Sequence, residues 1–193
     1  MHEEMKRLDQ IVLIGMFIGF SWLAMQAVHE FGHVLGTVMS GGHVTKVVLH
    51  PCTISRTDVH PNPHPLFVAW AGPILGVLLP LLSFLFARAL RWPGVFLFRF
   101  FAGFCLIANG VYIGFGSIQG FADAGDMLRQ GSSRWQLILF GILTAPAGLY
   151  LWNGLGPKFG LGDARGTVSH SAALAALSLF VILVGVELAI GSK

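Results

Sequence analysis

The stretch from residue 11 to residue 39 reads IVLIGMFIGFSWLAMQAVHEFGHVLGTVM, and its length and apolar character decide the class of fold. A helix needs about 20 apolar residues to cross about 30 Å of hydrocarbon, and this run is long enough. It nevertheless contains three ionisable residues, His29, Glu30 and His33. Because such groups are costly inside a bilayer, their presence in a spanning helix indicates a function.

The composition of the whole chain agrees with this interpretation. Of its 193 residues, 54% are hydrophobic and 11% are charged, whereas soluble domains carry about 25% charged residues. The formal charge of +3 comes from scattered Lys and Arg, not from a basic run, so nothing favours nucleic-acid binding. We therefore expect an integral, multi-pass membrane protein whose surroundings are the lipid bilayer.

Four more apolar runs follow the first one. The predicted spans cover residues 11–39, 66–90, 95–117, 135–152 and 172–190. Between the first two spans, residues 43–50 read HVTKVVLH, and their β-branched side chains predict a short strand. The expected fold class is an all-α polytopic membrane protein of about five transmembrane helices, with a short β-strand loop between the first and second. We treat residues 1–193 as a single domain, with a core at 11–130 and additional helices at 131–193.

The run His29-Glu30-Phe31-Gly32-His33 has the spacing of a metal-binding motif. Residues four apart lie on one face of a helix, so two imidazoles can bind one metal ion while Glu30 lies beside it to handle a proton. A catalytic zinc normally takes three protein ligands. The third can come from Asp123 or Asp126, because alternating spans bring the end of the third span to the same side of the membrane as the motif. Glu187, in the last span, is a further candidate.

Several short motifs, in this order, resemble the site-2 proteases, a family of intramembrane zinc metalloproteases. The matching segments are HEFGH at 29–33, GGHV at 41–44, AGP at 71–73 and DAGDML at 123–128. The family's third zinc ligand is the Asp of an Asp-Gly-x-x-hydrophobic-Leu pattern, so the resemblance implies Asp123 for this role, with Asp126 as the fallback. Family members usually carry Asn where this chain has Gly76, and Asn109 in the third span is a candidate replacement.

The resemblance implies a zinc-dependent intramembrane endopeptidase that hydrolyses peptide bonds in or near transmembrane segments of membrane proteins. One Zn²⁺ per chain would be held by His29, His33 and Asp123, with Glu30 as the catalytic general base. The expected partners are a substrate with a transmembrane segment and an upstream protease or regulatory partner, and the expected location is the cell (plasma) membrane. The alternative is a noncatalytic membrane protein that binds a metal or a partner through a degenerate motif.

The loop between the first two spans leaves two questions open. Its strand could hold an unwound substrate by main-chain hydrogen bonds, or it could merely cover the protein's own site. Its histidines match no standard ligand spacing, so we do not expect a second metal site there; they are His43, His50, His60 and His64. Lys and Arg are divided too evenly between the two sides to predict the orientation in the membrane.

Overall fold

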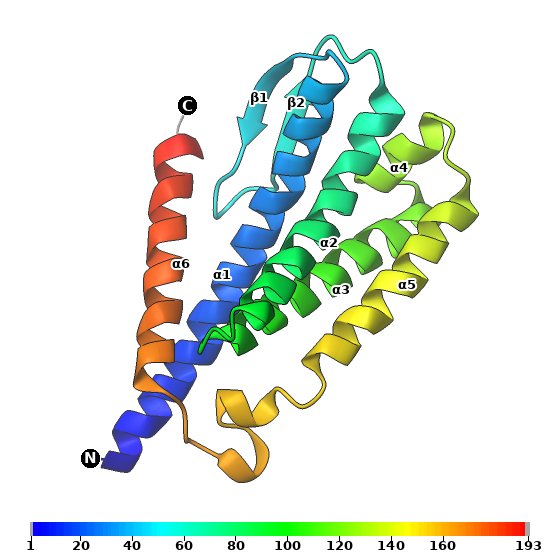
Figure 1. Cartoon of the computed structure of the whole chain (residues 1–193). Helices are drawn as coiled ribbons and strands as arrows, with labels where there is room; N and C mark the ends of the chain where they lie inside the picture. Colours follow the sequence, from blue (N-terminus) through cyan, green and yellow to red (C-terminus); the bar gives the residue numbers. More distant parts are fainter. Residues whose placement is uncertain (1, 192–193) are drawn as a thin grey trace.

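Five long apolar helices dominate the computed structural model, which describes residues 2–191 (Figure 1). Each is long and apolar enough to cross a membrane. They are α1 (His2–Met39), α2 (Pro65–Ala89), α3 (Val95–Gln119), α5 (Arg134–Trp152) and α6 (His170–Gly191). The predicted fold class is confirmed. The largest difference in boundaries is at α1, which begins nine residues before the predicted span, at His2 instead of residue 11, because the charged residues that precede the span are good helix formers.

Shorter elements connect these helices. An antiparallel pair of strands, β1 (Val44–Val48) and β2 (Arg56–Val59), joins α1 to α2 and confirms the predicted strand in this loop. The short helix α4 (Ala122–Arg129) lies between α3 and α5. Two 3₁₀ turns, η1 (Gly156–Phe159) and η2 (Gly162–Ala164), lead from α5 to α6. The hairpin and α4 lie toward the same end of the molecule, opposite the η turns (Figure 1).

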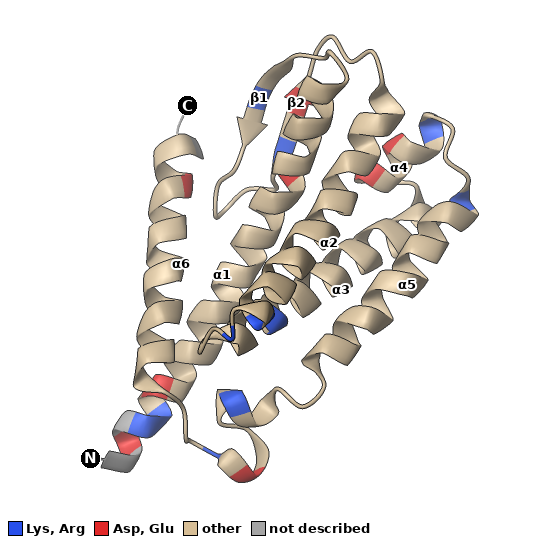
Figure 2. Cartoon of the chain, in the orientation of Figure 1, with Lys and Arg blue, Asp and Glu red and all other residues tan. Residues whose placement is uncertain are grey.

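Charged residues gather toward the two ends of the bundle (Figure 2). The middles of α2, α3 and α5 carry no Lys, Arg, Asp or Glu. The outward faces of the helices instead expose large apolar side chains, including Trp22, Phe86, Leu143 and Ile182. An apolar exterior of this extent suits contact with lipid tails.

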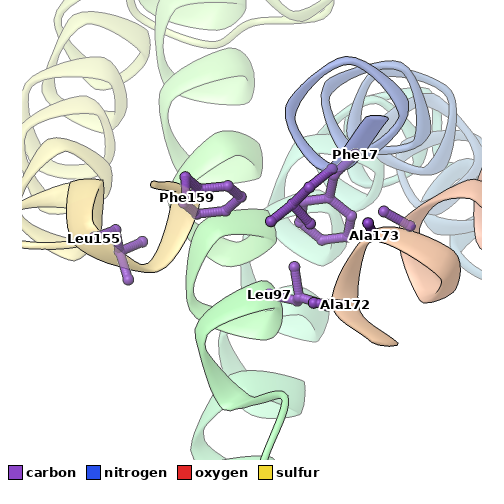
Figure 3. Packing of buried hydrophobic residues seen from close by; sticks show 8 residues of the cluster. Phe17, Leu97, Leu155, Phe159, Ala172 and Ala173 are labelled. Carbon is purple, nitrogen blue, oxygen red and sulfur yellow. The ribbon is translucent and has the colours of Figure 1, made fainter. Parts of the chain in front are cut away.

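A cluster of buried apolar residues holds the bundle together at the end opposite the hairpin. Phe17 of α1, Leu97 of α3 and Phe159 of η1 meet Ala172 and Ala173 of α6 there (Figure 3). A hydrogen-bonded pair adds to this contact, because His170 Nδ1 lies 2.9 Å from Asp9 Oδ1. The first turn of α6 is therefore fixed against the first half of α1.

Candidate metal centre

Helix α1 presents its two motif histidines close to its C-terminal end. His33 lies six residues, or about 9 Å, before the last helical residue, Met39. Both imidazoles are buried, and their Nε2 atoms are 3.1 Å apart. The helical spacing thus places two nitrogen ligands at one point, as the sequence predicted.

The other ring nitrogen of each histidine is held by a carbonyl oxygen. His29 Nδ1 lies 2.7 Å from Asn109 Oδ1, and His33 Nδ1 lies 2.8 Å from the backbone oxygen of Val68. With Asn109 oriented so that its oxygen faces the ring, each partner can only accept a hydrogen bond, so each Nδ1 donates. This arrangement fixes both ring orientations and directs both Nε2 atoms to the shared point, as is typical of metal-binding histidines.

Asp123, in the first turn of α4, completes a triangle of ligand atoms. Its Oδ2 lies 2.7 Å from His29 Nε2 and 3.4 Å from His33 Nε2. In a tetrahedral zinc site with bonds of about 2.05 Å, neighbouring ligand atoms are about 3.3 Å apart. The separations of 3.1 and 3.4 Å are close to that value and the separation of 2.7 Å is shorter, so His29, His33 and Asp123 form a group that could hold a metal ion.

The electrostatics of the site favour an ionised Asp123. Burial by itself raises the pKa of this carboxyl group. When Nε2 of His29 and of His33 carries a proton in place of a metal ion, their hydrogen bonds to Asp123 outweigh burial and hold the pKa of the carboxyl group well below its usual range. The carboxylate needs positive charge at the centre of the triangle, which a proton or a divalent cation supplies. A neutral imidazole pair and one carboxylate suit a divalent transition metal.

A tight turn between α3 and α4 aims Asp123 at the histidines. Gly120 ends α3 with φ 69°, and Ala122 follows with φ 50°. The left-handed conformation costs a residue with a Cβ atom roughly 1 kcal/mol or more, so the chain accepts strain directly before Asp123. Asp126 lies elsewhere on α4, where it is exposed and paired with Arg129. The structure thus brings Asp123, and not the fallback residue, to the histidines.

Helix α2 approaches the motif closely because it carries glycine opposite a histidine. A Cβ atom added to Gly72 would collide with the imidazole of His33. Gly32 of α1 likewise faces the backbone of Ala71 with no room for a side chain. The AGP segment at 71–73 therefore serves as the surface against which the second motif histidine is packed.

An amide from α3 fills the space next to Gly76, the position for which the sequence suggested a replacement amide. A Cβ atom added to Gly76 would lie 2.8 Å from Asn109 Oδ1, so the amide of α3 occupies the space beside this glycine. The same amide is the partner of His29. The sequence suggested Asn109 as a replacement amide, but not that it would orient a histidine.

Glu30 lies beside the triangle and is bonded to the hairpin. The residue is 4% exposed, and its Oε2 accepts a hydrogen bond of 2.7 Å from Thr57 Oγ1 on β2. Nothing in the spacing of the loop suggested Thr57, because strand register and not sequence distance brings it to α1.

The remaining candidates do not join the centre. Among the side chains that the structure describes, no other group of three His, Cys, Asp or Glu converges as a metal site would require. Glu187 is buried in α6, where one carboxylate oxygen lacks a hydrogen-bond partner and His50 is the nearby titratable group. The four loop histidines belong to no such group among the described side chains.

Comparison of the chain with protein-family models, with curated proteins and with solved structures finds no match.

Proposed function

We propose that this protein is a zinc-dependent intramembrane endopeptidase, similar to the site-2 proteases, that cuts peptide bonds in or near transmembrane segments of membrane proteins. The observation that carries the proposal is the convergence of His29 Nε2, His33 Nε2 and Asp123 Oδ2 at the end of an apolar helical bundle, with Glu30 beside them. Three buried ionisable groups on one membrane helix are costly unless they have a function.

The ligand set favours zinc among the divalent metals. Two imidazoles and one carboxylate are typical of catalytic zinc sites, which keep a fourth position open. When bound, zinc acidifies a water molecule and polarises the carbonyl of the peptide bond to be cut. His29 and His33 would hold the ion through Nε2 because their Nδ1 atoms donate to Asn109 and to the Val68 carbonyl.

Glu30 is the residue of this chain that can move the proton. Its carboxylate is next to His29 in the chain, and helical geometry places it at the edge of the ligand triangle. We assign it the general-base role, taking the proton of the attacking water and returning it to the leaving amine. Substrate would reach the site from the membrane, because α1, α2 and α3 are each long and apolar enough to cross one.

Metal content tests the ligand assignment. Detergent-purified wild type should contain about one zinc per chain by elemental mass spectrometry. The metal should be lost in His29→Ala and Asp123→Ala, and kept in the matched controls Asp126→Ala and Glu187→Ala. Loss with Asp126→Ala or Glu187→Ala alone would overturn the choice of Asp123. A folded wild type without stoichiometric metal would overturn the protease proposal.

Turnover separates the enzyme from the noncatalytic alternative. A library of single-span peptides, each with a fluorophore and a quencher at its ends, is incubated in micelles with the zinc-loaded protein. Glu30→Gln should keep its zinc and lose cleavage, since glutamine cannot accept the proton. If the zinc-loaded wild type, like Glu30→Gln, cleaves none of the peptides, a metal- or partner-binding protein is favoured. If both proteins cleave equally well, Glu30 is not the general base.

The proposal extends to the setting in which the protein acts. We place the protein in the cell membrane, acting on substrates that an upstream protease has trimmed or that a regulatory partner delivers. Efficient cleavage of an untrimmed, full-length membrane protein by the purified protein alone would contradict the requirement for either.

A further inference from the structure

The hairpin is joined to the catalytic motif by one side chain. Strand β2 packs against α1 (Figure 1), and Thr57 Oγ1 lies 2.7 Å from Glu30 Oε2. The hydroxyl also lies 3.5 Å from the backbone oxygen of Glu30. It carries a single hydrogen, so the short contact with the carboxylate is the bond that it makes.

The pleat of the strand makes this contact specific to position 57. Arg56 is exposed and Asp58 is half-buried, and the two side chains pair with each other, which places both on the outer face of the strand. Neighbouring residues of a strand point to opposite faces, so Thr57 points inward to α1. A slip of one residue would turn a charged side chain toward Glu30.

The pairing of the two strands holds Thr57 at this height along α1. Thr57 is opposite Val47 in the antiparallel ladder, and the register shifts between Val44 and Lys46. The hydroxyl of Thr45, at this irregularity, bonds to the backbone oxygen of Asp58, 2.9 Å away. The two strands therefore carry one threonine hydroxyl each, with different partners: that of Thr45 bonds within the hairpin and that of Thr57 bonds to the motif.

We infer that Thr57 is a positioning residue for Glu30, an inference that rests on the proposed function. A carboxylate on a free side chain rotates and exchanges its two oxygens. The hydroxyl of Thr57 holds Oε2, which leaves Oε1 as the oxygen that takes and returns the proton. The hairpin thus acts on the chemistry through Glu30, besides covering this side of the site.

A small ligand tests the inference without a known substrate. Acetohydroxamate chelates the open position of a zinc-type site and passes its proton to the neighbouring carboxylate. Its affinity for cobalt-loaded protein can be followed by the visible absorption of the metal. Thr57→Val should weaken binding about 10-fold, the order expected for losing a hydrogen bond to a charged group. Thr57→Ser, which keeps the hydroxyl, should stay within about 3-fold of wild type.

Two comparisons separate positioning from a structural role. Thr45→Val removes the threonine hydroxyl of the other strand and should leave acetohydroxamate affinity unchanged. In a Glu30→Ala background, Thr57→Val should have no further effect, because a residue that acts through Glu30 is coupled to it. On any peptide that the wild type cleaves, Thr57→Val should lower kcat and leave KM and cobalt content unchanged.

The outcomes are distinct. If Thr57→Val binds acetohydroxamate as tightly as wild type does, Thr57 does not position Glu30, while the proposed function stands. The same holds if Thr57→Val lowers the affinity by the same factor in the Glu30→Ala background as in wild type. If Thr45→Val weakens binding as much as Thr57→Val, the effect belongs to hairpin stability and the inference is wrong. If cobalt-loaded wild type does not bind acetohydroxamate, the open metal position required by the proposed function is missing, and the inference fails with it.

Discussion

Asn109 is the side chain that orients His29. Its Oδ1 accepts from His29 Nδ1 at 2.7 Å, and its own amide donates to the Cys105 carbonyl at 2.9 Å. The second bond fixes the amide so that its oxygen, and not its nitrogen, faces the ring. One neutral residue on α3 thus selects the nitrogen of His29 that is available to a metal.

Removing this amide should weaken metal binding without removing a ligand. In Asn109→Leu, the Nδ1 donor of His29 loses its acceptor, and zinc affinity should fall about 10- to 100-fold. Competition with a chromogenic chelator measures the affinity. Asn153→Leu, at an exposed position after α5, is the matched control and should bind zinc as wild type does. Equal affinities for wild type and Asn109→Leu would show that His29 does not depend on Asn109.

Gly72 should be intolerant of even a methyl group. In Gly72→Ala, the new Cβ atom meets the His33 imidazole, so either the ring or α2 must move. Such overpacking costs about 1–3 kcal/mol, and we expect a lower unfolding temperature together with loss of zinc. Gly15→Ala on α1 is the control, since nothing lies within 4 Å of its added Cβ atom. A helix gains stability from this control substitution, so the two variants should shift the unfolding temperature in opposite directions.

At the scale of elements, glycines allow α3 and α5 to pack closely. A Cβ atom added to Gly114 would lie 3.1 Å from the Cα atom of Gly141, and one added to Gly148 would lie 2.6 Å from the backbone oxygen of Gly103. Small residues let membrane helices approach until their backbones touch. This contact supports the helix that carries Asn109 and leads into α4.

A large residue at this contact should separate the two helices. Gly141→Leu should lower the unfolding temperature in detergent by several degrees, corresponding to about 1–3 kcal/mol of overpacking. Gly185→Leu on α6 is the control, because this glycine is exposed and has open space where a Cβ atom would be. Unfolding temperatures that match for the two leucine variants would contradict close packing of α3 on α5.

At the scale of the whole molecule, the candidate metal centre links parts of the chain that are far apart in sequence. Its candidate ligands lie on α1 and α4, and Asp123 follows His33 by 90 residues in the sequence. A metal bound by such a set binds the folded protein and not the unfolded chain, so it should stabilise the whole fold.

Zinc should therefore raise the unfolding temperature. At 100 times the Kd, binding contributes about 2.7 kcal/mol, which for a chain of this length corresponds to about 5–10 °C. Glu30→Gln should keep the full shift, since Glu30 is not a ligand, and Asp123→Ala should lose it. Differential scanning fluorimetry with and without a chelator measures both. The same shift in Asp123→Ala would place the zinc outside this centre.

The sequence by itself determined the class of protein, the spans and the pair of histidines. These features are local: twenty apolar residues predict a spanning helix wherever they occur, and helical geometry fixes the distance between His29 and His33. The boundary of α1 was missed by nine residues because a run of good helix formers extends the helix beyond its apolar part. The resemblance to site-2 proteases supplied Asp123, which the spacing alone left open against Asp126 and Glu187.

Only the tertiary structure decided which distant groups meet the histidines. The left-handed turn at Gly120 and Ala122 brings Asp123 to the histidines, and helix packing brings Asn109 to His29. Strand register brings Thr57 to Glu30. Each of these contacts joins residues at least 27 positions apart, so no local pattern encodes it. The physical reason is that the helical period fixes neighbours three or four residues away, whereas contacts between elements depend on how whole helices and strands pack.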